Sequence, residues 1–120
     1  FYHNVFCLKE IYSKTEELLD DYFKKDKHIE LGLPTVQYFA EKMNVSSNYL
    51  SDMLRTLTGQ STQQHIHNKL IEKAKETLVT TNLSVSEIAY QLGFEHPQSF
   101  SKLFKNKTKV TPKDFRSTFN

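Results

Sequence analysis

Two segments of the chain carry polar side chains that could hydrogen-bond the edges of nucleic-acid bases. The spacing of the apolar residues around them leaves these side chains on the outer faces of two predicted helices. The residues on these outer faces are Asn48, Tyr49, Ser51, Asp52, Arg55 and Thr56 in one segment, and Pro97, Gln98, Ser99, Ser101, Lys102, Lys105 and Asn106 in the other. Amides can bond adenine in bidentate fashion, lysine can donate to guanine, and a carboxylate can accept only from cytosine. Their chemistry therefore favours recognition of bases over catalysis.

Catalysis and metal binding have little support in the sequence. The motifs GxSxG, HExxH, CxxC and the phosphate-binding glycine loop are all missing. His65 and His67 stand two apart on a predicted helix, so they do not share a face and make a poor metal pair. His65 falls where a second copy of the pattern carries Phe115, which predicts a core or boundary histidine. We therefore expect no enzyme activity, no cofactor and no metal site.

The charge of the chain is uneven although its net value is only +2 over 120 residues. Residues 1–33 carry more acidic than basic side chains, whereas residues 95–120 hold six Lys and Arg against only Glu95 and Asp114. A polyanion would therefore be attracted first to the C-terminal end. The single cysteine excludes an internal disulfide and fits a reducing cytosol, so a cytoplasmic location is predicted. No membrane span or signal peptide is visible.

The elements that position these residues form a repeat over 36–58 and 85–108. The offset between the copies is 49 residues in the first half and 50 in the second, because one residue is added at the internal turn. Matched residues are Val36, Phe39, Ala40, Met43, Leu50, Ser51, Met53, Leu54 and Thr58, and then Val85, Ile88, Ala89, Leu92, Phe100, Ser101, Leu103, Phe104 and Thr108. Each copy is typical of a helix-turn-helix.

Seven helices and no strand are predicted, which makes the fold all-α. The two helix-turn-helix units, homeodomain-like and in tandem, would be joined by one long helix over about 61–79. That helix would be roughly 28 Å long, against about 34 Å between successive major-groove faces on one side of B-DNA. We divide the chain into a first segment over 1–33, a helix-turn-helix over 34–60, a linker helix over 61–82 and a second helix-turn-helix over 83–120. Ser46 or Ser47, Ser84 or Ser86, and Thr111 are the predicted helix caps.

The second copy resembles the DNA-binding domain of the AraC/XylS family of transcription regulators. The residues that carry the resemblance are Ile88-Ala89, Gly93-Phe94, Ser99-Phe100-Ser101-Lys102-Leu103-Phe104-Lys105, Thr111-Pro112 and Phe115-Arg116. The first copy matches more weakly, through Leu33, Ala40, Tyr49-Leu50, Leu54 and Thr58-Gly59. The resemblance covers about residues 8–118 and implies seven helices, in agreement with the apolar periodicity.

The resemblance also implies which side chains contact double-stranded DNA. Base contacts are expected from Asn48, Ser51, Asp52, Pro97, Gln98, Ser99, Ser101 and Lys102. Phosphate contacts, which position a helix without reading sequence, are expected from Ser47, Arg55, His96, Lys105 and Lys107. Members of the family usually recruit RNA polymerase and carry this domain behind a sensor or effector domain. The start at Phe1 rather than Met fits a part of such a longer protein.

The chain departs from the family pattern at three positions. Lys109 stands where a glycine usually follows the reading helix, so it should adopt a positive φ. Lys107 is more polar than usual, and Asp52 replaces a basic residue found in some relatives. Because a carboxylate is repelled by phosphates, the second unit should bind DNA more tightly than the first. The alternative from a different class is an all-α protein-interaction module that does not bind DNA.

Overall fold

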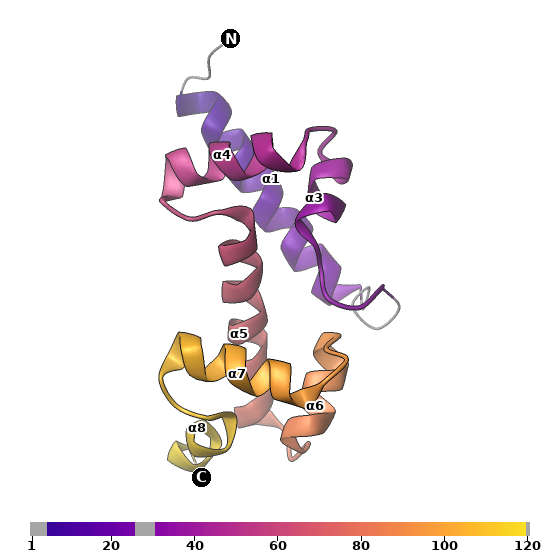
Figure 1. Cartoon of the computed structure of the whole chain (residues 1–120), viewed down its shortest axis with the longest axis vertical. Helices are drawn as coiled ribbons and strands as arrows, with labels where there is room; N and C mark the ends of the chain where they lie inside the picture. The colour runs from indigo at the N-terminus through magenta and orange to yellow at the C-terminus, as the bar shows by residue number, and fades with distance from the viewer. Residues whose placement is uncertain (1–4, 26–30, 120) are drawn as a thin grey trace. The chain divides into compact units, whose positions relative to one another are not determined.

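The fold is described by a computed structural model that covers residues 5–25 and 31–119. Over these ranges the chain forms helices and no strand, as the sequence predicts (Figure 1). The helices are α1 (Val5–Lys24), α3 (Val36–Lys42), α4 (Ser47–Thr58), α5 (Thr62–Thr80), α6 (Val85–Leu92), α7 (Pro97–Thr108) and α8 (Pro112–Thr118). None of the helices in the described ranges has the length and apolar character needed to cross a bilayer.

The chain divides into two compact units. Among the described residues, the first unit takes 5–25 and 34–66, and the second takes 31–33 and 67–119. Each unit contains one helix-turn-helix, α3–α4 in the first and α6–α7 in the second. The division falls inside α5, so this helix contributes its first residues to one unit and the rest to the other. The short segment before Pro34 belongs to the second unit although the residues on both sides of it belong to the first.

The core of the first unit joins α1 to the helix pair. Its fully buried side chains include Leu19 and Tyr22 from α1, Phe39 from α3, and Leu50 and Leu54 from α4. The rings of Tyr22 and Phe39 lie 6.0 Å apart. Burial of such side chains stabilises a fold by about 1.5–3 kcal/mol each before entropy costs, so α1 is an integral part of this unit.

The core of the second unit is built on a row of phenylalanines. Phe100 and Phe104 of α7 are fully buried, with ring centroids 5.9 Å apart, and the ring of Phe115 in α8 lies 5.5 Å from that of Phe104. Arg116 ties α8 to the end of α5, because its Nε donates to the Leu78 carbonyl at 3.0 Å and its Nη2 donates to the Thr81 carbonyl at 3.3 Å. These bonds satisfy carbonyls at the C-terminal end of α5 that lack helical partners.

The helix ends follow the predicted capping chemistry. The two positions that the sequence left open are settled: Ser46 caps α4 and Ser84 caps α6, where Glu87 completes a capping box. Thr111 caps α8 as expected. The backbone N–H of Ser84 donates to the Glu87 carboxylate at 2.9 Å, and this bond, with a contribution from the Ser84 side chain, lowers the pKa of Glu87. Glu87 is exposed, so this interaction fixes the local helix start and adds little to global stability.

The repeat in the sequence is a repeat in backbone conformation. The turn inside each unit places Asn44 or Gly93 at positive φ (59° and 105°), and the end of each second helix places Gly59 or Lys109 there (81° and 71°). The prediction that Lys109 adopts a positive φ is therefore confirmed.

The threonine shared by the two copies has a structural role at the end of each second helix. The hydroxyl of Thr58 lies 2.8 Å from the Leu54 carbonyl and 3.3 Å from the Gln60 carbonyl. Thr108 repeats this pattern with Phe104 at 2.8 Å and Val110 at 3.0 Å. The match between these threonines therefore reflects helix termination and needs no functional explanation.

Candidate nucleic-acid interface

The outer face of α4 presents a short set of polar side chains. Asn48, Asp52 and Arg55 are exposed, and Asp52 forms an ion pair with Arg55 at 3.5 Å. Ser51 lies differently, because it is half-buried and its hydroxyl donates to Thr62 Oγ1 at 3.1 Å. The structure thus brings Asn48 and Asp52 together on an open face one helical turn apart, whereas Ser51 links α4 to α5.

The start of α4 is held by a side-chain cap. The Ser46 hydroxyl accepts the backbone N–H of Tyr49 at 3.0 Å, and Ser47, the first helical residue, is half-buried. A phosphate contact from Ser47 therefore depends on its partly accessible hydroxyl. The cap satisfies one of the free N–H groups of the first turn and fixes the entry angle of the helix.

The outer face of α7 is wider and more basic. Gln98, Ser99 and Lys102 are exposed near the beginning of the helix, and Lys105 is exposed one turn further on. Gln98 and Lys102 are four residues apart, so they share one face of the helix. Pro97 and Ser101 are half-buried at the margin of this face. The structure therefore gathers amide, hydroxyl and ammonium groups on the first turns of α7.

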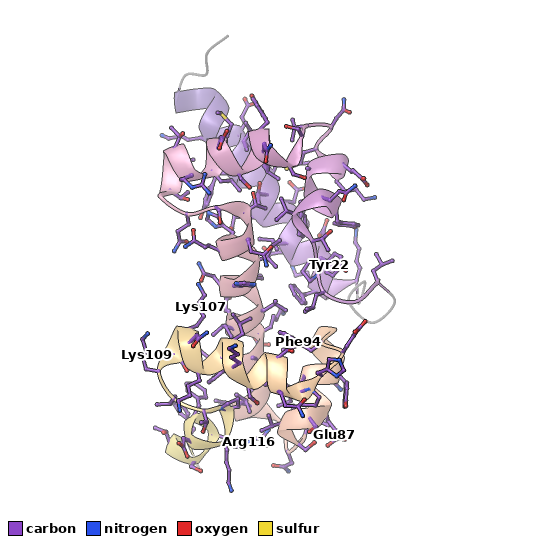
Figure 2. All side chains as sticks on the ribbon, viewed as in Figure 1. Tyr22, Glu87, Phe94, Lys107, Lys109 and Arg116 are labelled. Carbon is purple, nitrogen blue, oxygen red and sulfur yellow. The ribbon has the colours of Figure 1, made fainter. Side chains whose placement is uncertain are left out.

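Positive charge extends along α7 toward its C-terminal end. Lys107 and Lys109 are exposed there (Figure 2). Within the described ranges, no carboxylate forms an ion pair with Lys102, Lys105, Lys107 or Lys109, whereas Arg55 of α4 is paired. Unpaired cations are the groups that release counterions when they meet phosphates. The face of α7 is therefore better suited than that of α4 to bind a polyanion.

His65 belongs to the core of the first unit, as its match to Phe115 predicts. It is 9% exposed, and its Nε2 lies 2.9 Å from the Thr58 hydroxyl oxygen. Because the Thr58 hydroxyl donates to the Leu54 carbonyl, its oxygen is free to accept the Nε2–H of a neutral ring. Burial lowers the pKa of His65, and Glu16, whose carboxylate lies 3.9 Å from Nδ1, opposes that shift.

His67 lies in the second unit, where burial lowers its pKa and the positive charge of Lys107 lowers it further. A neutral ring beside a lysine does not compete with Lys107 for a phosphate. The positive charge at this end of α7 therefore comes from the lysines and not from His67.

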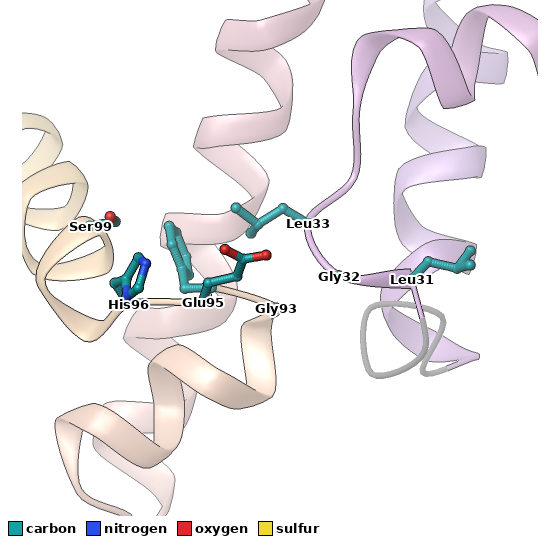
Figure 3. Close-up of a pocket in the computed structure, with 8 residues that line it drawn as sticks. Leu31, Gly32, Leu33, Gly93, Glu95, His96 and Ser99 are labelled. Atoms are coloured by element: carbon teal, nitrogen blue, oxygen red, sulfur yellow. The ribbon is translucent and has the colours of Figure 1, made fainter.

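Residues 31–33, for which the sequence predicts no contact with DNA, line a cavity of about 380 Å³ at the start of α7. We call this segment the strap. The remaining lining residues lie in and just after the α6–α7 turn: Gly93, Phe94, Glu95, His96 and Ser99 (Figure 3). His96 is exposed at the N-cap position of α7 but makes no capping bond. In the sequence, only Gly32 could have indicated that residues 31–33 pack against the α6–α7 turn. Contact between glycines far apart in the chain leaves no periodic pattern.

Comparison with known proteins places this geometry among helix-turn-helix proteins. A family model described as a helix-turn-helix domain matches residues 39–118. The regulatory protein SoxS of Escherichia coli is 34% identical over 91 residues, covering 76% of this chain and 84% of that protein. An uncharacterised helix-turn-helix transcriptional regulator from the cgkA 5′ region of Pseudoalteromonas carrageenovora is 31% identical over 99 residues. The match covers 82% of this chain but only 57% of that relative.

Solved structures share the same architecture. The C-terminal domain of AraT, a response regulator from Geobacillus stearothermophilus, is similar with a TM-score of 0.76 and 31% identity. The similarity covers 90% of this chain and 84% of that domain. The likeness therefore extends over most of the chain.

Proposed function

The chain belongs to the AraC/XylS family of helix-turn-helix transcription regulators, and from this we propose that it binds specific sequences of double-stranded DNA. In this proposal α4 and α7 each read one stretch of major groove. The observation that carries this proposal is the outer face of α7, where Gln98, Ser99 and Lys102 are exposed at the start of the helix. Within the described residues, no carboxylate forms an ion pair with Lys102. The first half of a recognition helix is the part that meets base edges.

The residues proposed to read bases differ in how directly they can do so. Gln98 is suited to adenine and Lys102 to guanine, while the Ser99 hydroxyl can serve either base or phosphate. In α4, Asn48 is the strongest candidate because it is exposed and its amide suits adenine. Ser51 and Ser101 are half-buried, so we propose indirect roles for them at the margins of their helices.

Phosphate contacts are proposed for residues further along the two helices and at their starts. Lys105 and Lys107 are exposed cations beyond the base-reading turns of α7, and Arg55 occupies the corresponding part of α4. His96 and Ser47 lie at the beginnings of α7 and α4, where backbone N–H groups also favour an anion. Because Arg55 is already paired with Asp52, α4 should contribute less electrostatic binding than α7.

We also propose that this domain works as part of a longer regulator that recruits RNA polymerase. The matched regulator from Pseudoalteromonas carrageenovora is nearly twice as long as the region it shares with this chain. The AraT domain is the C-terminal domain of a response regulator. Both support a sensor or effector domain joined to this one. Transcription in vitro with purified RNA polymerase, on templates with and without the bound sequence, would test recruitment directly.

A gel-retardation assay tests the proposed DNA binding. At low salt the purified chain should retain random genomic fragments, and retention should fall steeply as salt rises because phosphate contacts release counterions. DNase footprinting on a retained fragment should protect about two major-groove turns. Failure to retain any fragment at low salt would contradict DNA binding and favour the protein-interaction module.

A further inference from the structure

The turn of the second helix-turn-helix differs from that of the first in what lies against it. The two turns begin with the same backbone hydrogen bond: the N–H of Val45 donates to the Ala40 carbonyl at 3.0 Å, and the N–H of Phe94 donates to the Ala89 carbonyl at 3.0 Å. The residue before each donor has positive φ, Asn44 at 59° and Gly93 at 105°. The first turn therefore accepts a side chain at a position where the second has none.

The strap explains why the second turn carries glycine. A Cβ placed on Gly93 would lie 2.7 Å from the carbonyl carbon of Gly32 and 2.8 Å from the backbone nitrogen of Leu33. Contacts this short to backbone atoms cannot be relieved by rotating a side chain. Figure 3 shows Gly32 beside Gly93, with Leu33 directed toward the side where Glu95 lies and Leu31 directed away from it. Gly93 is thus required for the close approach of the strap as well as for its φ.

The second reading helix also lacks the cap that the first one has. Ser46 accepts a backbone N–H at the start of α4, whereas His96 at the same place in α7 makes no side-chain capping bond. Between the residue with positive φ and the N-cap of the second helix, the second unit has Phe94 and Glu95, where the first unit has only Val45. A longer turn without a cap leaves the entry angle of α7 less constrained by local bonds. Contacts from elsewhere in the unit must then supply that constraint.

We propose that the strap is a positioning part of the second helix-turn-helix, whose contact with Gly93 holds the α6–α7 turn and so fixes the first turn of α7 for base reading. This inference rests on the proposed DNA binding by α7. The strap and the start of the reading helix border the same cavity, whose lining includes Leu33, His96 and Ser99. Loss of the strap contact should therefore loosen base discrimination by α7 while leaving phosphate binding by its lysines intact.

The substitution Gly93→Asn separates the contact from the backbone conformation. Asparagine tolerates positive φ better than most residues, and the equivalent turn already holds Asn44 at a positive φ of 59°, against 105° at Gly93. Loss of function in Gly93→Asn therefore reports the collision with the strap. Asn44→Gly is the matched control, because it alters the same turn position in the first unit, where the side chain of Asn44 is exposed.

The measurement is base discrimination in a binding titration at a temperature where circular dichroism shows each variant folded. The probes are the DNA selected by the wild-type chain and two altered copies, one changed at the bases read by α7 and one at those read by α4. For Gly93→Asn, discrimination at the α7 bases should fall about tenfold, the size of one lost base-pair contact. Its discrimination at the α4 bases and its affinity for random DNA should stay at wild-type values, and Asn44→Gly should change neither discrimination.

Three results would overturn the proposal: wild-type discrimination by Gly93→Asn at the α7 bases, an equal loss at both sets of bases, or the same loss in Asn44→Gly. If Gly93→Asn does not fold, Leu33→Ala decides, since it removes the side chain that packs the strap into the cavity at the start of α7 and so loosens the strap against the turn without a backbone collision. Wild-type discrimination by Leu33→Ala would then contradict the proposal.

A second readout does not depend on DNA and separates this inference from the proposed function. In the free protein, amide hydrogen exchange at Phe94 should be faster in Leu33→Ala than in the wild type, while exchange at Val45 should not change. Unchanged exchange at Phe94 would overturn the positioning role even if the wild-type chain binds DNA. Faster exchange at Phe94 in a chain that retains no DNA would refute the proposed function and leave the strap contact established.

Discussion

At the scale of single residues, the face of α7 separates two kinds of lysine. Lys102 lies within the first turns beside Gln98, whereas Lys105 lies further along with Lys107. Replacing Lys102 with Ala should weaken discrimination at one base pair by about 1–3 kcal/mol. Replacing Lys105 with Ala should weaken binding to all sequences about equally and reduce the salt slope by about one.

Titrations of both variants against the selected DNA and random DNA at several salt concentrations would measure this difference. Each substitution removes one positive charge from the same helix, so each variant is the matched control for the other. Identical behaviour of the two variants would contradict the division between base reading and phosphate binding.

His65 gives the first unit a defined dependence on pH. Because burial lowers the pKa of His65 below its ordinary value of 6.5, the folded state binds a proton less readily than the unfolded chain. The contribution of neutral His65 to stability should be fully present above about pH 6.5 and should be lost as pH falls through the folded-state pKa. His65→Phe, which copies the aromatic residue of the second unit, should lack this loss.

Urea unfolding of the wild type and of His65→Phe between pH 8 and pH 5 measures the effect of His65. The difference between the two free energies of unfolding isolates His65 from His67, which shifts in the same direction in the second unit. A difference that stays constant with pH would show that His65 does not titrate differently in the folded state.

At the scale of the elements, the end of α7 stores backbone strain. Lys109 has φ 71°, and its backbone N–H donates to the Lys105 carbonyl at 2.8 Å, where Gly59 makes the same bond to Arg55 after α4. Lys109→Gly should stabilise the second unit by about 1 kcal/mol by relieving this strain. Lys109→Ala is the control, because it removes the same charge and keeps a Cβ at positive φ.

Thermal unfolding of both Lys109 variants would test this prediction. The expected order of melting temperature is Lys109→Gly above Lys109→Ala. Equal melting temperatures would show that the left-handed conformation costs the chain nothing at this position.

The sequence could predict most of the elements because their signals are local. Apolar spacing located the helices, and serine or threonine before a helix located its cap, although it could not choose between Ser46 and Ser47 or between Ser84 and Ser86. That choice depends on which hydroxyl reaches a free N–H in the first turn. The half-buried position of Ser51 was missed because its partner, Thr62, belongs to another helix.

At the scale of the whole molecule, the repeat in sequence conceals a difference between the copies. The first unit fixes its reading helix with a serine cap and pairs its only exposed arginine on that helix with Asp52. The second unit has no such cap on α7 and packs the strap against its turn, and within the described ranges no carboxylate pairs with Lys102, Lys105 or Lys107 of α7. Contact between residues so far apart in sequence has no periodic signature, so the sequence alone could not reveal the strap.

The most direct test of the account is selection of bound sequences from a random DNA pool by the wild-type chain, followed by measurement of the base preference at each position. The account predicts two groups of preferred bases about one helical turn apart, with the stronger preference in the group read by α7. Assignment of the groups follows from repeating the selection with Lys102→Ala, which should weaken preference in that group alone. A pool without base preference, or a stronger group that Lys102→Ala leaves unchanged, would contradict the account.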